Sequence, residues 1–238
     1  MPTGVARGLS VWIVLLACCA RVTGAQQPAV RLEPLSPFSA RKAEALLRNH
    51  LPCLGCHRLG RDGGAIGPDL TTVRERRSPA YIAAMIADPQ RLVPGSVMPK
   101  TRMPDATRDL IARFLASQPG NAPDTPLPAP GPPVVPPETD GAALYARWCV
   151  SCHGRTGRGD GPNAANLPVK PAAHASREAM SARPDDSLFD TIAGGGAIMN
   201  RSARMPSFGA TLTPQEIRAL VRHIRSLCRC EGPGWSRP

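Results

Sequence analysis

Residues 53–57 read Cys-Leu-Gly-Cys-His, and residues 149–153 read Cys-Val-Ser-Cys-His. The pattern C-x-x-C-H therefore occurs twice, and its two copies begin 96 positions apart, which is the scale of one small domain. The surrounding features repeat as well. A helix-like segment precedes each copy, and Met-Pro followed by an amphipathic helix comes after it. This repetition predicts two similar helical units in the chain of 238 residues.

The adjacent histidine separates C-x-x-C-H from other paired-cysteine motifs. It marks the attachment of c-type haem, where both thiols form thioethers and the histidine reaches the iron. C-x-x-C alone would also fit a redox dithiol or half of a zinc site. Two complete copies in an exported chain favour two covalently bound haem c groups. The predicted attachment residues are Cys53, Cys56, Cys149 and Cys152. His57 and His153 are then the predicted iron ligands on one side of each haem.

The N-terminus predicts export. Arg7 precedes an apolar stretch from Leu9 to Ala20, and small residues up to Ala25 offer a cleavage site. A signal peptide over residues 1–25 and a periplasmic location are therefore expected. The alternatives are a lipoprotein attached through Cys18 and an uncleaved membrane anchor, although the apolar stretch is short for a bilayer span.

Composition and charge argue against a large β fold and against nucleic-acid binding. The aromatic share of 4% is low for a large β-sandwich or barrel, and the 28 prolines are clustered. The formal charge is +11, and loss of Arg7 and Arg21 with the signal peptide would leave +9. The basic residues are scattered, with no dense run and no interleaved aromatics, so nucleic acid is not an expected partner. The basic surface suits an acidic redox partner or serves only as a solvated face.

The order of helix, C-x-x-C-H, loops, Met-Pro and final helix closely resembles the class I cytochrome c family. The resemblance covers nearly all of the chain after the signal peptide. It implies an all-α fold of two tandem class I cytochrome c domains joined by a proline-rich linker. The expected boundaries are 36–117 for domain 1, 118–138 for the linker, 139–230 for domain 2 and 231–238 for a tail.

In that family, the first and last helices cross closely beside the haem. Gly141 resembles the small residue at this crossing, with Tyr145 packed nearby, and the first half offers Ala43 or Ala45. His223 stands where the family carries an aromatic residue on the last helix.

Two helix starts are predicted from capping residues. Thr213 to Glu216 forms a capping box with a proline at the first helical position. Asp105 is the predicted cap of the helix that carries Leu110 to Leu115.

The resemblance also implies a methionine as the second ligand of each iron, which raises the reduction potential. Met205 precedes a proline before the last helix and is the predicted ligand in the second half. In the first half, Met98 and Met103 both precede a proline. Met98 leaves more than one helical turn of chain before the last helix, as the family usually does, so it is the predicted ligand and Met103 the alternative. Met85 is expected in a helix core and Met199 in loop packing, while Met180 has no supporting context.

A backbone carbonyl that accepts the ring N–H of an iron-bound histidine fixes its tautomer. Pro68, in Gly-Pro-Asp-Leu at 67–70, resembles the family's residue that supplies this carbonyl. The second half has a longer variant of that loop and leaves open which of its proline carbonyls acts. The remaining histidines, His50, His174 and His223, are expected to be surface or packing residues.

The sequence alone does not decide the conformation of the proline-rich linker or the bonding of two further cysteines. Nine prolines between Gln118 and Glu138 favour polyproline II, and this linker would hold the domains apart or wrap around them as they dock. Cys228 and Cys230 fit no haem motif. They could form a mutual disulfide, join a partner or stay free, and an incidental feature of the tail is the default interpretation.

With histidine and methionine on each iron, no coordination position remains for a substrate. The predicted function is electron transfer between redox proteins, as a shuttle or as a subunit of a respiratory or dehydrogenase complex, and not catalysis by the chain itself. The alternative is a dihaem enzyme of the peroxidase or sulfur-compound oxidase type, with one open iron. Dihaem peroxidases are usually longer and carry further ligand residues that are not found in this sequence.

Overall fold

A computed structural model describes residue 1, residues 34–129 and residues 139–236. Within these ranges the protein is helical, apart from one antiparallel pair of short strands, β1 (Arg58–Leu59) and β2 (Asp62–Gly63), directly after the first motif. The all-α prediction is therefore confirmed. The predicted signal peptide, with Cys18 and the cleavage site after Ala25, lies outside the described residues except for its first residue. Among the described residues, no helix has the length and apolarity to cross a membrane.

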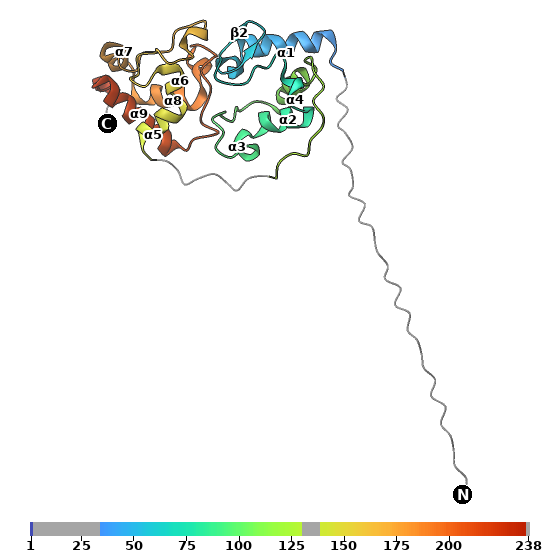
Figure 1. The fold of residues 1–238 in the computed structure, drawn as a ribbon. Coiled ribbons are helices and arrows are strands. Elements are labelled where there is room, and N and C mark those ends of the chain that lie inside the picture. Colours follow the sequence, from blue (N-terminus) through green and yellow to red (C-terminus); the bar gives the residue numbers. More distant parts are fainter. Residues whose placement is uncertain (2–33, 130–138, 237–238) are drawn as a thin grey trace.

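The first half of the chain packs its helices around one apolar core. Its helices are α1 (Pro37–Asn49), α2 (Pro79–Ala87), α3 (Pro89–Leu92) and α4 (Asp105–Ala116), with 3₁₀ turns η1 (Pro52–Gly55) and η2 (Val73–Glu75). Helices α1 and α2 both pack against α4 (Figure 1). The buried core comprises Ala43, Leu47, Leu54, Leu59, Leu70, Val73, Ile82, Ile111, Phe114 and Leu115.

The second half has a separate core. Its helices are α5 (Gly141–Trp148), α6 (Val150–His153), α7 (Arg177–Ser181), α8 (Asp185–Gly194) and α9 (Pro214–Cys228), with 3₁₀ turns η3 (Ala164–Asn166), η4 (Gly196–Met199) and η5 (Gly234–Ser236). Helix α9 packs against α5, α7 and α8. Met180, which the sequence left without a role, is fully buried in this core. The two halves lie side by side in Figure 1, and each buries its own apolar side chains.

Helices α5 and α9 cross at a glycine, as the resemblance implied. A Cβ atom on Gly141 would lie 2.2 Å from the carbonyl oxygen of Ala219, so the two backbones touch directly. The buried ring of Tyr145 lies 5.0 Å from that of His223 beside this contact. In the first half, Ala43 is the buried small residue of α1, whereas Ala45 faces solvent.

The two predicted helix caps have different outcomes. Thr213 and Glu216 form the expected capping box, with Glu216 Oε2 accepting the backbone N–H of Thr213 at 2.7 Å. The prediction that Asp105 caps α4 is wrong. Pro104 is the extended residue before the helix, so Asp105 already lies in the first turn, where it accepts a bond from Arg108 at 2.7 Å. Its negative charge in the first turn still interacts favourably with the positive end of the helix dipole.

The described part of the proline-rich segment, up to Ala129, begins by following the surface of the first half. The backbone N–H of Ala122 donates to the carbonyl of Arg74 at 2.6 Å. Gly120, with φ of 124°, lies so close that a Cβ atom on it would be 2.3 Å from the backbone nitrogen of Glu75. The segment thus starts by wrapping rather than by extending away.

Cys228 and Cys230 form a disulfide with each other at the end of α9. Arg229 between them adopts the left-handed conformation at φ 48°. The two cysteines are only 3% and 9% exposed and belong to the core of the second half. The default interpretation of an incidental tail feature is therefore wrong, because the two cysteines are bonded to each other and buried in the core of the second half.

Gly141→Val is expected to destabilise the protein, because its side chain would enter the space of the Ala219 carbonyl. Overpacking of this kind costs about 2 kcal/mol or more. Ala142→Val, at an exposed position of the same helix, serves as the control and should cost less than about 1 kcal/mol. Urea unfolding followed by circular dichroism measures both, and equal losses would show that the crossing does not require glycine.

The double variant Cys228→Ser/Cys230→Ser is expected to lower the free energy of unfolding by about 1–2 kcal/mol, because the bond closes only a very short loop. The absorption spectrum should stay unchanged, since neither cysteine lies in a C-x-x-C-H motif. A variant with a changed spectrum would contradict a purely structural role for this disulfide.

Candidate functional site

The first motif lies on a tight turn made by η1. The backbone N–H groups of Cys56 and His57 both donate to the carbonyl of Cys53, at 3.2 and 2.9 Å. Cys53 and Cys56 form no disulfide, whereas Cys228 and Cys230 are bonded to each other. Burial raises the pKa of Cys53 to about 11 and that of Cys56 to about 12. These thiols are therefore protonated at neutral pH.

The ring of His57 is fixed from two sides. Its Nδ1 lies 2.8 Å from the carbonyl oxygen of Pro68, which is the contact expected from the sequence. Gly67 lies against the ring, where a Cβ atom would be 2.6 Å from Nδ1. Burial lowers the pKa of His57. A neutral ring that donates from Nδ1 leaves Nε2 free to bind a metal.

The second motif repeats this arrangement on α6. The backbone N–H of His153 donates to the carbonyl of Cys149 at 2.9 Å, and its Nδ1 lies 2.9 Å from the carbonyl oxygen of Ala172. The expectation of a proline acceptor is therefore wrong in this half. The longer loop places the residue after Pro171, not a proline, opposite the ring. Cys149 and Cys152 also form no disulfide, and burial raises the pKa of Cys149 to about 12.

His174 is a site residue that the sequence did not single out. Its ring stacks on that of His153, with centroids 4.0 Å apart and an interplanar angle of 14°. Its Nδ1 lies 3.0 Å from the hydroxyl of Tyr145, and the residue is only 8% exposed. Burial lowers the pKa of His174 well below its usual range, so it is a neutral packing partner of His153. No signal in the sequence indicates this stacking, because the loop that carries His174 returns to His153 only in the fold.

The predicted methionine ligands lie in the loops before the last helix of each half. The backbone N–H of Met98 donates to Ser96 Oγ at 3.2 Å, and its carbonyl accepts a bond from the side chain of Gln90. The carbonyl of Met205 accepts the N–H of Gly196 at 3.1 Å. Met103 lies two residues before α4. All three methionines are partly buried, and their ligand roles stay predictions.

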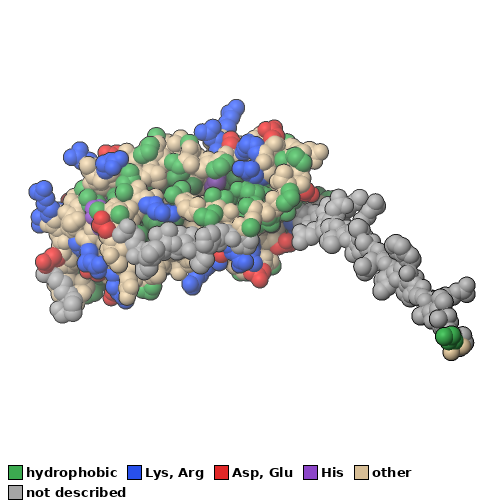
Figure 2. All heavy atoms as spheres, turned by 60° about the horizontal axis from the view of Figure 1, so that its bottom comes forward, with side chains coloured by type: hydrophobic (Ala, Val, Ile, Leu, Met, Phe, Trp, Pro, Cys, Tyr) green, Lys and Arg blue, Asp and Glu red, His purple; other side chains and the backbone are tan. Residues whose placement is uncertain are grey.

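The residues around both motifs suit a flat apolar group. Four large hydrophobic side chains are exposed in the loops that carry or adjoin the predicted ligands, and these are Ile66, Val97, Val169 and Ile198. On the face drawn in Figure 2, hydrophobic side chains are exposed between scattered Lys and Arg. A porphyrin held by the paired thiols would cover apolar surface of this kind. The donor set and its surroundings therefore fit haem c.

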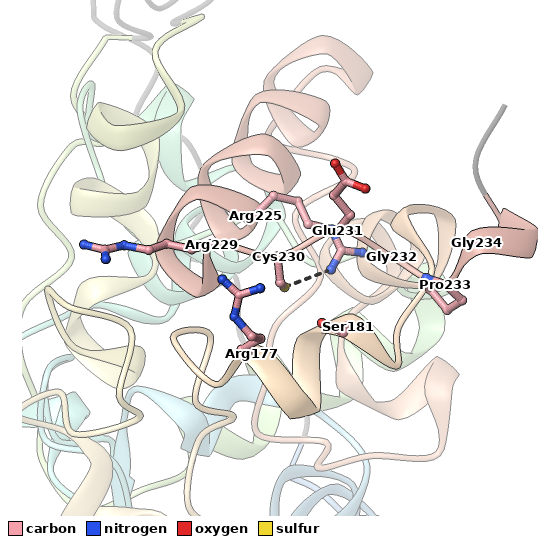
Figure 3. Close-up of a pocket in the computed structure, with 9 residues that line it drawn as sticks. All are labelled: Arg177, Ser181, Arg225, Arg229, Cys230, Glu231, Gly232, Pro233 and Gly234. Atoms are coloured by element: carbon pink, nitrogen blue, oxygen red, sulfur yellow. Dashed lines mark hydrogen bonds between the residues drawn. The ribbon is translucent and has the colours of Figure 1, made fainter.

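A pocket of about 710 Å³ lies elsewhere, at the end of α9. Its lining includes Arg177, Arg225, Arg229 and Cys230, and Arg225 donates to Cys230 Sγ at 3.8 Å (Figure 3). Arg225 is already paired with Asp185 at 2.6 Å. None of the predicted haem-binding residues lines this pocket, so it is not the candidate site.

Comparisons with known proteins bear on the second half most directly. Residues 136–224, which contain the second motif and Met205, match the family model described as cytochrome C oxidase, cbb3-type, subunit III. A search of the curated proteins found no match.

Two solved structures are similar to parts of the chain. The KustC0563 c-type cytochrome is 28% identical, with a TM-score of 0.31, over 37% of this chain and 96% of its own. A chain of the Kuenenia stuttgartiensis reducing HAO-like protein complex Kustc0457/Kustc0458 is 22% identical, with a TM-score of 0.32, over 82% of this chain and 97% of its own. Over residues 136–224 the chain is thus similar to a cytochrome c domain, a kind of domain that holds haem c covalently, and the second motif lies within this stretch.

Proposed function

We propose that the chain is a dihaem c-type cytochrome that carries electrons between redox proteins outside the cytoplasmic membrane. The observation that carries the proposal is the common geometry of the two C-x-x-C-H motifs. In each, the histidine N–H bonds to the carbonyl of the first cysteine at 2.9 Å. In each, the histidine Nδ1 lies 2.8 or 2.9 Å from a backbone carbonyl of the following loop. The first half thus shares the site geometry of the half that matches the cytochrome c model.

Haem c, when attached, supplies one-electron redox chemistry at its iron. The chain would hold one haem through Cys53, Cys56 and His57, with Met98 as the predicted opposite ligand. The corresponding residues of the second half are Cys149, Cys152, His153 and Met205. Histidine rings held by backbone carbonyls keep their orientation in both oxidation states, which favours rapid electron transfer.

A dithiol redox function fits these cysteines less well than haem attachment does. Dithiol exchange needs a thiolate, and reactive C-x-x-C pairs have a depressed pKa. Here, burial raises the pKa of Cys53, Cys56 and Cys149 to about 11 or 12. The raised pKa of these three thiols disfavours exchange through a thiolate.

The proposed setting is the periplasm, and its support is the N-terminal sequence alone. The charge of +9 that would remain after signal cleavage suits an acidic redox protein partner. The chain would act as a soluble shuttle or as a subunit of a respiratory or dehydrogenase complex. As a subunit, it could also be attached to the membrane through its N-terminus.

Optical spectroscopy of the full chain, produced with a haem-attachment system, tests this function. We expect two haems per chain, low-spin spectra in both oxidation states and no change on addition of carbon monoxide, because both irons are saturated. A carbon monoxide shift in the unmodified protein would mean an open iron and would favour the dihaem enzyme, such as a peroxidase or sulfur-compound oxidase. A single haem per chain would contradict the dihaem proposal.

Single methionine variants test the ligand assignment. Met205→Ala and Met98→Ala should each make one of the two haems bind carbon monoxide, because each removes one axial ligand. Met103→Ala is the matched control and should leave both haems insensitive. The reverse result for Met98→Ala and Met103→Ala would make Met103 the ligand of the first half.

A further inference from the structure

The two C-x-x-C-H motifs meet through one buried side chain, that of Asn163. This residue is 1% exposed. Its backbone N–H donates to the carbonyl of Ser151 in the second motif at 2.9 Å. Its side chain reaches the first half, where Nδ2 donates to the carbonyl of Gly55 at 2.8 Å and Oδ1 accepts the N–H of Ala65 at 2.9 Å. Gly55 and Ser151 occupy the same position in the two motifs.

Every polar atom of this amide has a partner. Besides its bond to Gly55, Nδ2 also donates to Cys152 Sγ at 3.5 Å. The amide thus spans from the thiol of one haem motif to the backbone of the other, next to Cys56. A buried amide with both ends satisfied is held in a single orientation.

The surrounding backbone leaves no room for other side chains. A Cβ atom on Gly64 would lie 2.9 Å from the amide atoms of Asn163. A Cβ atom on Gly55 would lie 2.0 Å from the carbonyl oxygen of Arg204, the residue before Met205. The first motif is therefore in direct contact with the loop of the predicted methionine ligand, and Asn163 joins it to the second motif.

Further polar contacts hold the ligand loops of the two halves together. The guanidinium of Arg204 pairs with Asp62 at 3.1 Å. The other contacts are Lys100 N–H to Thr211 Oγ1 at 2.8 Å, Arg102 to the Gly209 carbonyl at 3.3 Å, and Arg147 to the Gly95 carbonyl at 3.1 Å. The loop of Met98 and the loop after Met205 thus share one interface.

We propose that Asn163 is a positioning residue that fixes the two haem-attachment motifs to each other and provides the bonded route for electrons between the two redox centres. This inference rests on the proposed dihaem function. In the exchange, one electron leaves one iron, the other iron is reduced by it, and no proton needs to move. Electron tunnelling weakens with distance and crosses a bonded bridge more readily than an open gap. The bridge here runs from Cys152 through Asn163 to Gly55 and on to Cys56.

The test is Asn163→Leu in the full chain with its haems attached, with Asn166→Leu as the matched control. Leucine keeps the branching and the number of side-chain heavy atoms of asparagine and removes all three side-chain bonds, whereas Asn166 is an exposed residue at the end of η3, the 3₁₀ turn that follows Asn163. The readout is the rate of electron exchange between the haems after one of them is reduced by a light pulse. We expect Asn163→Leu to slow this rate at least tenfold and Asn166→Leu to change it less than twofold.

A third variant separates the bridge from the interface as a whole. Asp62→Asn breaks the ion pair with Arg204 and leaves the bonds of Asn163 in place, so the rate should change less than threefold. Hydrogen exchange supplies a readout that does not depend on the haems, because Asn163→Leu removes the acceptor of the Ala65 N–H and should speed exchange at that amide.

The failure of the inference differs from that of the proposed function. Two haems per chain with an unchanged exchange rate in Asn163→Leu would overturn the role of Asn163 alone, whereas one haem per chain in the unmodified protein would overturn the dihaem function. If Asn163→Leu fails to attach both haems, Asn163→Asp carries the same expectation, since it keeps the acceptor for Ala65 and loses the donor for Gly55. A normal rate in that variant would equally overturn the inference.

Discussion

Each C-x-x-C-H histidine is oriented by a hydrogen bond from its Nδ1 to a backbone carbonyl of the loop that follows the motif, and Gly67 or His174 packs against the ring. Without that bond, the imidazole could turn or present the wrong nitrogen to an iron. The carbonyls of Pro68 and Ala172 reach the rings only because each loop returns to its motif. The loop in turn rests on the core beneath it, which α1 and α4 build in one half and α5 and α9 in the other.

Local patterns predicted much of this arrangement. The spacing of the cysteines and histidines identified both motifs, and Thr213 with Glu216 identified the start of the last helix, because these signals lie within a few residues of each other. Gly141 was expected at a helix crossing through the family resemblance, and a Cβ there would indeed meet the backbone of α9.

Features that depend on the fold or on the exact backbone conformation could not be predicted from the sequence. The carbonyl of Ala172 accepts the hydrogen bond of His153 because the loop after the second motif is longer. Any residue type can supply a backbone carbonyl, so the sequence does not identify which one does. Asp105 has the residue type of a cap, but the extended backbone of Pro104 displaces it into the helix. Asn163 meets Gly55 across 108 positions of sequence, and no periodic pattern indicates that pairing. The sequence predicts a surface or packing role for His174, and only the fold shows that its packing partner is His153.

The two halves share the geometry of the C-x-x-C-H motif but differ in the contacts that surround it. The second half has the glycine crossing, the stacked His174 and the disulfide at the end of α9, whereas the first half uses Ala43 and a shorter loop. The exposed hydrophobic side chains beside the predicted ligands occur in both. In the proposed dihaem protein, these differences would give the two irons unlike surroundings, which favour unequal reduction potentials.

Peptide mapping of the purified protein by mass spectrometry tests the presence of a haem on each motif most directly. The account predicts one haem on the peptide that contains residues 53–57 and one on the peptide that contains residues 149–153. A haem on the second peptide alone, with free thiols at Cys53 and Cys56, would contradict it.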